Sequence, residues 1–353
     1  MDNKRISIME CTLRDGGLAI EDEVSYDKDV RRFDAEESSE IARHLAFSNA
    51  DFIELGSIES SESDKTGYAI YNSILDVSNI RPDIGTAIRF AALFRGPDTP
   101  LEQIPNYDTK LCECIRVIIR YSELKKSMDF CAALSQKGYK VFVQPMVTLR
   151  YTQEELTYVI KAANNLNAFA LYFVDSYGYM NADDVKRLYD KYDHLLDPSI
   201  HIGIHAHNNM NLAFANVIEF IKYSYSMNSR RKIIIDSTCL GMGQGAGNLQ
   251  TELLAGYLND NYDTDYDYSA ILDACEIVET HTPQSIWGYS VPRMLSANSK
   301  VAYKYAISLR RTYGLKYKDI YHIFRNIPED LRHRYTPQNT IDLLKMFGYK
   351  DIV

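Results

Sequence analysis

Eight short runs of apolar and β-branched residues recur along this 353-residue chain, and they constrain its fold more than any other feature. The runs are 6–11, 52–55, 88–93, 115–119, 141–145, 170–174, 201–205 and 232–235. Segments between them, such as 38–47 and 153–164, carry apolar residues at helical spacing, and Thr152 precedes the second as a capping box requires. Strands that alternate with helices indicate a parallel sheet. Eight of them close most simply into an α/β (β/α)8 TIM barrel.

The length of the chain leaves room for a second region after the barrel. A TIM barrel takes about 250 residues, so we assign residues 1–259 to it. Residues 260–353 have no further strand–helix alternation, and their apolar spacing predicts helices at 270–280, 300–313, 318–324 and 340–347. We therefore expect a C-terminal, mostly helical extension or small domain. The Tyr- and Asp-rich segment 261–268 is typical of a linker or an exposed loop.

Charge and cysteine usage exclude several classes of protein. Lys and Arg number 39 against 48 Asp and Glu, a net charge of −9, which argues against nucleic-acid binding. No run of 18 apolar residues could span a membrane, and no signal region opens the chain, so we expect a cytoplasmic protein. The six cysteines form no CxxC pairs, which favours buried thiols over a zinc site.

The end of the seventh strand carries two histidines, in the segment 203–209, GIHAHNN. Alternate strand residues share a face, so His205 and His207 point the same way, about 6.6 Å apart along the strand. Two imidazoles and a carboxylate from elsewhere would form a facial site for a divalent ion with open positions. A pair of hydrogen-bonded histidines is the alternative, and the motif alone leaves both open.

The end of the first strand, residues 12–17, reads TLRDGG. Arg14 and Asp15 follow the strand directly, and the glycines would allow a tight turn. Asp15 would supply the oxygen ligand, and Arg14 would face an anionic substrate as a planar, always-charged donor. Taken alone, a structural Arg–Asp pair explains these residues equally well.

The end of the eighth strand, residues 236–248, reads DSTCLGMGQGAGN. It satisfies the loose dinucleotide pattern GxGxxA, but it follows the last strand of a series and lacks the acidic residue of a Rossmann site. The glycines would instead bring the backbone close to a metal and its ligand, with Asn248 offering a neutral oxygen. A plain flexible loop is the alternative.

Together, these three strand ends resemble those of the pyruvate-enolate metal lyases of the HMG-CoA lyase-like TIM-barrel superfamily, and most closely those of 4-hydroxy-2-oxovalerate aldolase and its relatives. The matching segments are 12–16, 205–209 with Leu212, Ala215 and Asn216, and 241–248 with Thr251 and Glu252. They occur in the family's order and span the barrel.

The resemblance implies a role for each matching residue. Asp15, His205 and His207 match the family's ligands for a divalent metal, Mn²⁺ or Mg²⁺, and Asn248 matches an asparagine that also reaches the metal in the lyase branch. Arg14 matches the arginine that steadies the enolate oxygen.

The resemblance extends to three residues beyond these motifs. Tyr289 lies where the aldolases place a tyrosine near the substrate. Asp175 and Ser176, after the sixth strand, match a polar strand end that lines the same pocket.

One position departs from the pattern. The aldolases follow Arg-Asp-Gly with a histidine that acts as the base for the substrate hydroxyl, and here that position is Leu18. Leucine accepts no proton, so the base would be a metal-bound hydroxide, a tyrosine or His281, or the reaction would differ from the aldolase's.

The resemblance implies a metal-dependent carbon–carbon lyase or aldolase that acts on a 2-oxo acid, such as a 4-hydroxy-2-oxo acid, and gives pyruvate and an aldehyde. Two alternatives stay open: a catalytically silent or retuned barrel that binds metal and a partner protein, and a decarboxylase or acyl-transfer enzyme with the same metal chemistry. A partner dehydrogenase would contact the C-terminal region, as in the aldolases. Homo-oligomers are the commoner state of soluble enzymes.

Overall fold

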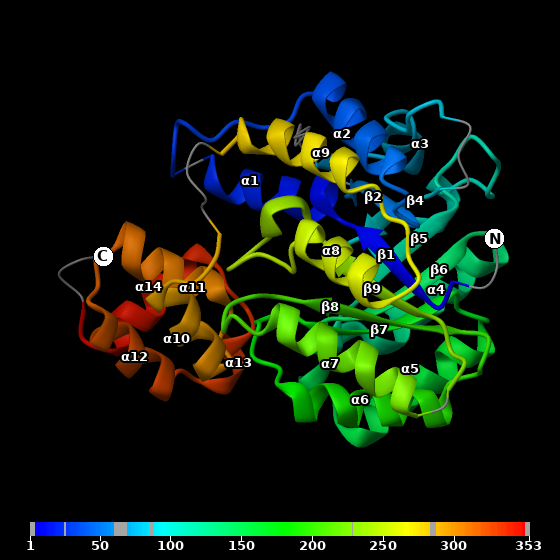
Figure 1. Cartoon of the computed structure of the whole chain (residues 1–353). Coiled ribbons are helices and arrows are strands. Elements are labelled where there is room, and N and C mark those ends of the chain that lie inside the picture. The colour runs from blue at the N-terminus through cyan, green and yellow to red at the C-terminus, as the bar shows by residue number, and fades with distance from the viewer. Residues whose placement is uncertain are drawn as a thin grey trace.

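The computed structural model describes residues 4–24, 26–59, 69–84, 88–227, 229–282 and 287–349. Eight parallel strands close into a barrel with helices between them, and five further helices gather beside it, on the left of Figure 1. The prediction of a TIM barrel with a helical C-terminal region is therefore confirmed.

The eight barrel strands coincide with the eight apolar runs, and they are β1 (Ile6–Glu10), β2 (Phe52–Ile58), β4 (Arg89–Phe94), β5 (Cys114–Ile119), β6 (Lys140–Pro145), β7 (Ala170–Asp175), β8 (His201–Ala206) and β9 (Ile233–Ser237). A two-residue strand, β3 (Ile70–Tyr71), adds to the end of β2. The barrel strands pair in chain order, and β1 pairs with both β9 and β2, which closes the barrel. Glu10 lies opposite Ser237 in this register, so the loops after β1 and β9 start side by side.

Helices cover the outside of the barrel, and they are α1 (Gly17–Glu23), α2 (Ala35–Phe47), α3 (Ile74–Ser78), α4 (Leu124–Gln136), α5 (Gln153–Asn165), α6 (Ala182–Leu195), α7 (Ala213–Ser226), α8 (Thr251–Asn261) and α9 (Tyr268–Glu279). Helix α5 starts at the predicted capping box, in which the Thr152 hydroxyl and the Glu155 carboxylate each accept the other residue's amide N–H. In the described ranges, no helix combines the length and apolar character that a membrane crossing requires.

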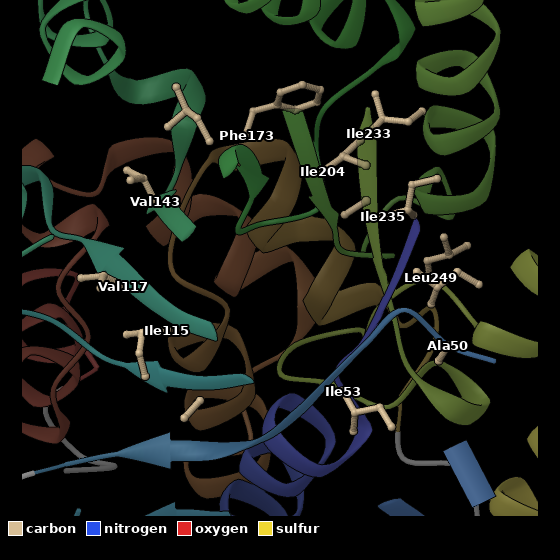
Figure 2. Packing of buried hydrophobic residues seen from close by; sticks show 14 of the residues in the cluster. Ala50, Ile53, Ile115, Val117, Val143, Phe173, Ile204, Ile233, Ile235 and Leu249 are labelled. Atoms are coloured by element: carbon tan, nitrogen blue, oxygen red, sulfur yellow. The ribbon is translucent and has the colours of Figure 1, made fainter. Parts of the chain in front are cut away.

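The main hydrophobic core lies between the strands and these helices. Figure 2 shows its side chains on β2, β5, β6, β7, β8 and β9, among them Ile53, Val117, Phe173 and Ile235. Each is buried, and burying a side chain of this size stabilises the fold by about 1.5–3 kcal/mol. The core thus holds the strands in place on the side away from the barrel interior. The six cysteines are free and buried, as predicted.

The barrel interior changes from apolar to polar toward the carboxyl ends of the strands. A small interior cluster includes Phe52, Cys114, Phe142, Ala170 and Ile234. Side chains two residues further along a strand share its face, and on these five strands they are Glu54, Arg116, Gln144, Tyr172 and Asp236. All five are buried. The upper layer of the barrel is therefore built from charged and hydrogen-bonding groups.

A second hydrophobic core belongs to the C-terminal helices, which are α10 (Val291–Ser299), α11 (Tyr303–Ile307), α12 (Tyr317–Asn326), α13 (Glu329–Arg332) and α14 (Pro337–Met346). It includes Leu295, Ile323 and Leu343, whereas α9 and Trp287 pack into the barrel core. The hydrophobic contacts thus change from one core to the other between Trp287 and Leu295. The predicted division of the chain at residue 260 stays a prediction.

The helix predicted over 300–313 is confirmed over 303–312, but its predicted start is wrong. Lys300 has a positive φ of 55° and ends α10, and a new helix starts at Tyr303 and runs into a π-helical turn, η6 (Ser308–Thr312). Helix α10 was not predicted, although Pro292 in its first turn is a helix-start signal.

The prediction of a glycine turn after the first strand is also wrong. Residues Thr12–Gly16 form a π-helical turn, η1, that continues into α1, and Gly16 and Gly17 have helical φ angles of −62° and −60°. Close packing explains the glycines instead. A Cβ on Gly16 would lie 2.8 Å from Met242 Sδ, and one on Gly17 would lie 2.6 Å from Ala69 Cβ.

Candidate active site

Three residues from opposite ends of the barrel sequence converge at the carboxyl ends of the strands. Asp15 lies in η1 after β1, His205 lies in β8, and His207 follows β8. One oxygen of Asp15 and one nitrogen of each histidine lie within 4.8 Å of one another, and all three residues are buried. His205 Nε2 and His207 Nε2 lie 3.5 and 3.9 Å from Asp15 Oδ2. The geometry is that of a candidate metal centre.

Hydrogen bonds at the Nδ1 atoms orient both imidazoles. His205 Nδ1 lies 2.7 Å from Asp236 Oδ2, and His207 Nδ1 lies 2.9 Å from the carbonyl oxygen of Asp175. A carboxylate and a carbonyl only accept, so each Nδ1 carries the proton and donates it. In the neutral rings, the Nε2 lone pairs therefore point toward Asp15, as metal-ligating histidines require.

Asp15 is ionised by its surroundings. Burial raises its pKa, but Arg14, His205 and His207 outweigh burial and lower the pKa well below the usual range. Arg14 Nη1 donates to Asp15 Oδ1 at 2.8 Å, and Asn248 Nδ2 donates to Asp15 Oδ2 at 2.5 Å. A carboxylate that is charged at every ordinary pH is the form that binds a divalent cation.

The two histidines titrate in opposite directions. Burial and the neighbouring His205 lower the pKa of His207 to about 4, so this ring is neutral at pH 7. Burial also lowers the pKa of His205, but its bonds to Asp15 and Asp236 outweigh burial and raise the pKa above the usual value. Asp15 and Asp236 thus make the centre attractive to positive charge.

Asn248 provides an independent test of whether a cation fits. Its Nδ2 donates to Asp15 Oδ2 and to the Met242 carbonyl, which fixes the orientation of the amide. Its Oδ1 is buried and has no hydrogen-bond partner among the described residues. A buried, unsatisfied amide oxygen is costly unless something else satisfies it. Together with two Nε2 atoms and a carboxylate, this donor set fits a divalent cation.

A network of buried charged residues in the barrel interior is hydrogen-bonded to residues of the centre. The sequence analysis did not predict this network. Arg116 Nη1 donates to Glu54 Oε2 at 2.7 Å, and its Nη2 bonds to Asp236, the partner of His205. Arg14 Nε also donates to Glu54 Oε2, at 2.7 Å. With the Gln144 amide in its satisfied orientation, its oxygen accepts from Arg116 as well. The sequence signal that could have predicted this network is the presence of charged residues in strands that are expected to be buried.

Asp175 and Ser176 contribute to the site through the backbone. The Asp175 carboxylate accepts the amide N–H groups of Tyr179 and Met180, while its carbonyl orients His207. The Ser176 hydroxyl accepts the Val147 amide. Both side chains therefore hold the loops after β6 and β7, and their predicted contact with substrate stays a prediction.

The other predicted proton-transfer residues, Tyr289 and His281, differ from each other in exposure. Tyr289 is 55% exposed in the loop before α10, and in the described residues no bond links it to the cluster. His281 is fully buried between the Arg31 carbonyl and Glu37. Leu18 is buried in α1.

Tyr303 is a further side chain that sequence reasoning missed. Its ring lies 3.5 Å from the position of a Cβ on Gly245, in the glycine loop before Asn248. Its hydroxyl donates to Asp22 Oδ2 at 2.8 Å, and Lys304 bonds to the same carboxylate. The first turn of α11 thus meets the mouth of the barrel beside the candidate centre.

Comparison with known proteins finds a family match within the barrel. Residues 116–278 match the family model described as HMGL-like. The resemblance stated from the sequence is therefore confirmed.

Individual proteins give more detail. The chain is 29% identical over 292 residues to a 4-hydroxy-2-oxovalerate aldolase of Carboxydothermus hydrogenoformans, covering 78% of this chain and 77% of the relative. It is 26% identical over 254 residues to an oxaloacetate decarboxylase of Mycobacterium tuberculosis, covering 71% and 69%. The structure of hydroxymethylglutaryl-CoA lyase from Pseudomonas aeruginosa shares the fold, with a TM-score of 0.60 and 18% identity over 80% of this chain and 93% of that one.

Proposed function

We propose that this protein is a divalent-metal-dependent carbon–carbon lyase that cleaves a 4-hydroxy-2-oxo acid to pyruvate and an aldehyde, or catalyses the reverse condensation. The observation that carries the proposal is the convergence of Asp15, His205 and His207, with both Nε2 atoms turned toward the carboxylate. The relatives named 4-hydroxy-2-oxovalerate aldolase support the choice of substrate class.

In this reaction, the bond between C3 and C4 breaks and its electron pair stays on C3. The C4 hydroxyl loses its proton and becomes the aldehyde carbonyl, and a proton added at C3 gives pyruvate. A divalent cation held by Asp15, His205 and His207, with Asn248 beside them, would supply Lewis-acid stabilisation of the 2-oxo group.

Arg14 adds fixed positive charge to the site. Its Nε and Nη1 are held by Glu54 and Asp15, and among the described residues its Nη2 has no hydrogen-bond acceptor. A guanidinium fixed on two sides loses little entropy when its remaining N–H groups bind an oxygen that gains negative charge. Burial of the centre strengthens this interaction.

The test measures pyruvate released from 4-hydroxy-2-oxopentanoate with Mn²⁺, in the wild type and in Asp15→Asn. The substitution keeps the shape but removes the charged oxygen, so we expect the rate to fall at least about a hundredfold and Mn²⁺ binding to weaken strongly. Asp129→Asn on the exposed surface of α4 is the matched control and should change neither.

Two results would contradict the proposal. If the wild-type protein binds no Mn²⁺, the proposed metal centre is ruled out. Wild-type protein that binds Mn²⁺ through Asp15 but releases no pyruvate from any 2-oxo acid would favour the catalytically silent barrel.

One observation favours a decarboxylase as the second candidate. Loss of CO₂ from oxaloacetate leaves the same enolate but requires no base for a hydroxyl proton, and Leu18 occupies the position of the aldolase histidine. A relative named oxaloacetate decarboxylase agrees with this. The decarboxylase is favoured if the wild type forms pyruvate from oxaloacetate but not from 4-hydroxy-2-oxopentanoate, and if Asp15→Asn abolishes this activity.

A further inference from the structure

A large cavity lies on the same face of the barrel as the candidate centre. Its volume is about 850 Å³, within the usual range for small-molecule sites. Its walls come from the residues that end or follow β2, β4, β5, β6 and β7, and from α13 and the residues after it. The centre is built from the ends of β1, β8 and β9, which complete the same ring of strands. The cavity and the centre therefore both lie at the carboxyl ends of the barrel strands.

Charged side chains line the cavity, and most of them neutralise one another. The lining residues with formal charge are Arg95, Arg120, Arg150, Arg334, Glu59, Asp98, Glu123 and Asp330. Arg95 pairs with Glu59, and Arg120 pairs with Asp98 and Glu123. In the described part of the chain, Arg150, Arg334 and Asp330 form no ion pair. The formal charges of these eight residues sum to zero, but among the described residues no carboxylate pairs with Arg150 or Arg334, so an anion is favoured at these two side chains.

The Arg150 side chain is exposed and lies against an aromatic ring. Its guanidinium lies 4.3 Å from the centre of the Tyr121 ring, a cation–π arrangement that restricts its motion. Burial and the charge of Arg150 lower the pKa of the lining residue His333 to about 4, so the imidazole stays neutral at pH 7. His333 stacks on Tyr177 and bonds to its hydroxyl at 3.1 Å. Arg150 therefore faces a neutral imidazole at His333, and it also interacts electrostatically with the Glu155 carboxylate.

We propose that this cavity binds an anionic group, a carboxylate or a phosphate, at the far end of the substrate's tail, with Arg150 as the main contact and Arg334 as the second. The inference rests on the proposed function and names the kind of 2-oxo acid that the site takes. A guanidinium binds either oxyanion through paired N–H groups. The substrate class is thus a 4-hydroxy-2-oxo acid with a second negative charge, rather than one that ends in a methyl group.

The first experiment measures binding without turnover. Glutarate and inorganic phosphate are titrated into the metal-free, full-length protein by calorimetry, for the wild type, Arg150→Gln and Arg334→Gln. We expect about tenfold weaker binding in Arg150→Gln, a smaller loss in Arg334→Gln, and weaker binding for all of them at high salt. Arg187→Gln, an exposed arginine of α6, is the control and should bind like the wild type. Equal affinity in the wild type and Arg150→Gln, or no binding by the wild type, would overturn the inference.

The second experiment measures specificity with Mn²⁺ present. The substrates are 4-hydroxy-2-oxopentanoate, 4-hydroxy-2-oxoheptanedioate and the product of pyruvate and glyceraldehyde 3-phosphate, which end in a methyl group, a carboxylate and a phosphate. We expect kcat/KM to favour one of the two anionic tails, and Arg150→Gln to lower that preference about tenfold through KM. A preference that Arg150→Gln leaves unchanged would contradict the inference. No pyruvate from any substrate, with glutarate still bound through Arg150, would overturn the proposed function but not the anion site.

Discussion

Arg116 lies inside the barrel between two carboxylates, Glu54 and Asp236, and is buried almost completely. Burial raises the pKa of Asp236, but Arg116 and His205 outweigh burial and lower it below the usual value. Asp236 in turn orients the His205 ring. Arg116 therefore acts on the candidate centre through Asp236, as a positioning residue.

At this scale we predict that Arg116→Met destabilises the fold by about 3–5 kcal/mol, because it leaves two buried carboxylates without their cation. Urea unfolding of the metal-free protein measures the effect. Arg116→Lys keeps the charge but loses the paired hydrogen bonds and should cost less. A loss in Arg116→Met no larger than in Arg187→Met, on the surface of α6, would show that the network contributes little.

The element that most affects the site is the π-helical turn η1. It directs Arg14 and Asp15 into the mouth of the barrel and is continuous with α1. Gly16 packs against Met242 of the glycine-rich loop, which brings that loop close enough for Asn248 to reach Asp15. The packing of a helical turn against a loop thus assembles two of the three strand ends.

We predict that Gly16→Ala destabilises the protein by about 1–3 kcal/mol, since the new Cβ would overlap Met242 at 2.8 Å. Its helical φ is compatible with alanine, so the cost comes from packing alone. Gly256→Ala in α8 is the matched control. There the Cβ meets Tyr268 at an ordinary 3.6 Å, and alanine should stabilise the helix by about 0.5–1 kcal/mol. Thermal unfolding distinguishes the two, and stabilisation by both substitutions would contradict the packing argument.

For the molecule as a whole, Glu10 joins the two ends of the barrel sequence. Its carboxylate, at the end of β1, accepts bonds from Thr12, from the Cys239 amide and from the Thr251 hydroxyl, which both follow β9. Burial nonetheless raises the pKa of Glu10 from 4.5 to about 7. The folded state therefore binds a proton that the unfolded chain has released at pH 5–7.

This raised pKa predicts a pH dependence of folding. The contribution of Glu10 to stability is complete below about pH 4.5 and is lost as the pH rises through 7. Between pH 5 and pH 8, the wild type should lose about 2 kcal/mol of unfolding free energy relative to Glu10→Gln. Urea unfolding at several pH values checks this, with Glu276→Gln on the exposed face of α9 as the control. Parallel curves for the wild type and Glu10→Gln would contradict the prediction.

The amino-acid sequence by itself determined the architecture and the main residues of the candidate centre. Strand periodicity determines which residues face the core. Parallel strands with helical connections close into a barrel whose first and last strands are neighbours. The carboxyl ends of the strands that carry Asp15, His205 and Asn248 are therefore brought together. The helix boundaries after residue 290 were less predictable, because a left-handed residue such as Lys300 divides a continuous apolar pattern without any compositional signal.

Only the tertiary structure decided how the centre is supported and what lies beside it. Glu54, Arg116 and Asp236 come from three strands, and periodicity assigns a face to each charge but not a partner. The cavity around Arg150 depends on where α13 packs, which hydrophobic patterning leaves open. The pairing of charges from different strands and the packing of the C-terminal helices on the barrel depend on the three-dimensional positions of residues that are distant in the sequence. Local sequence patterns do not give these positions.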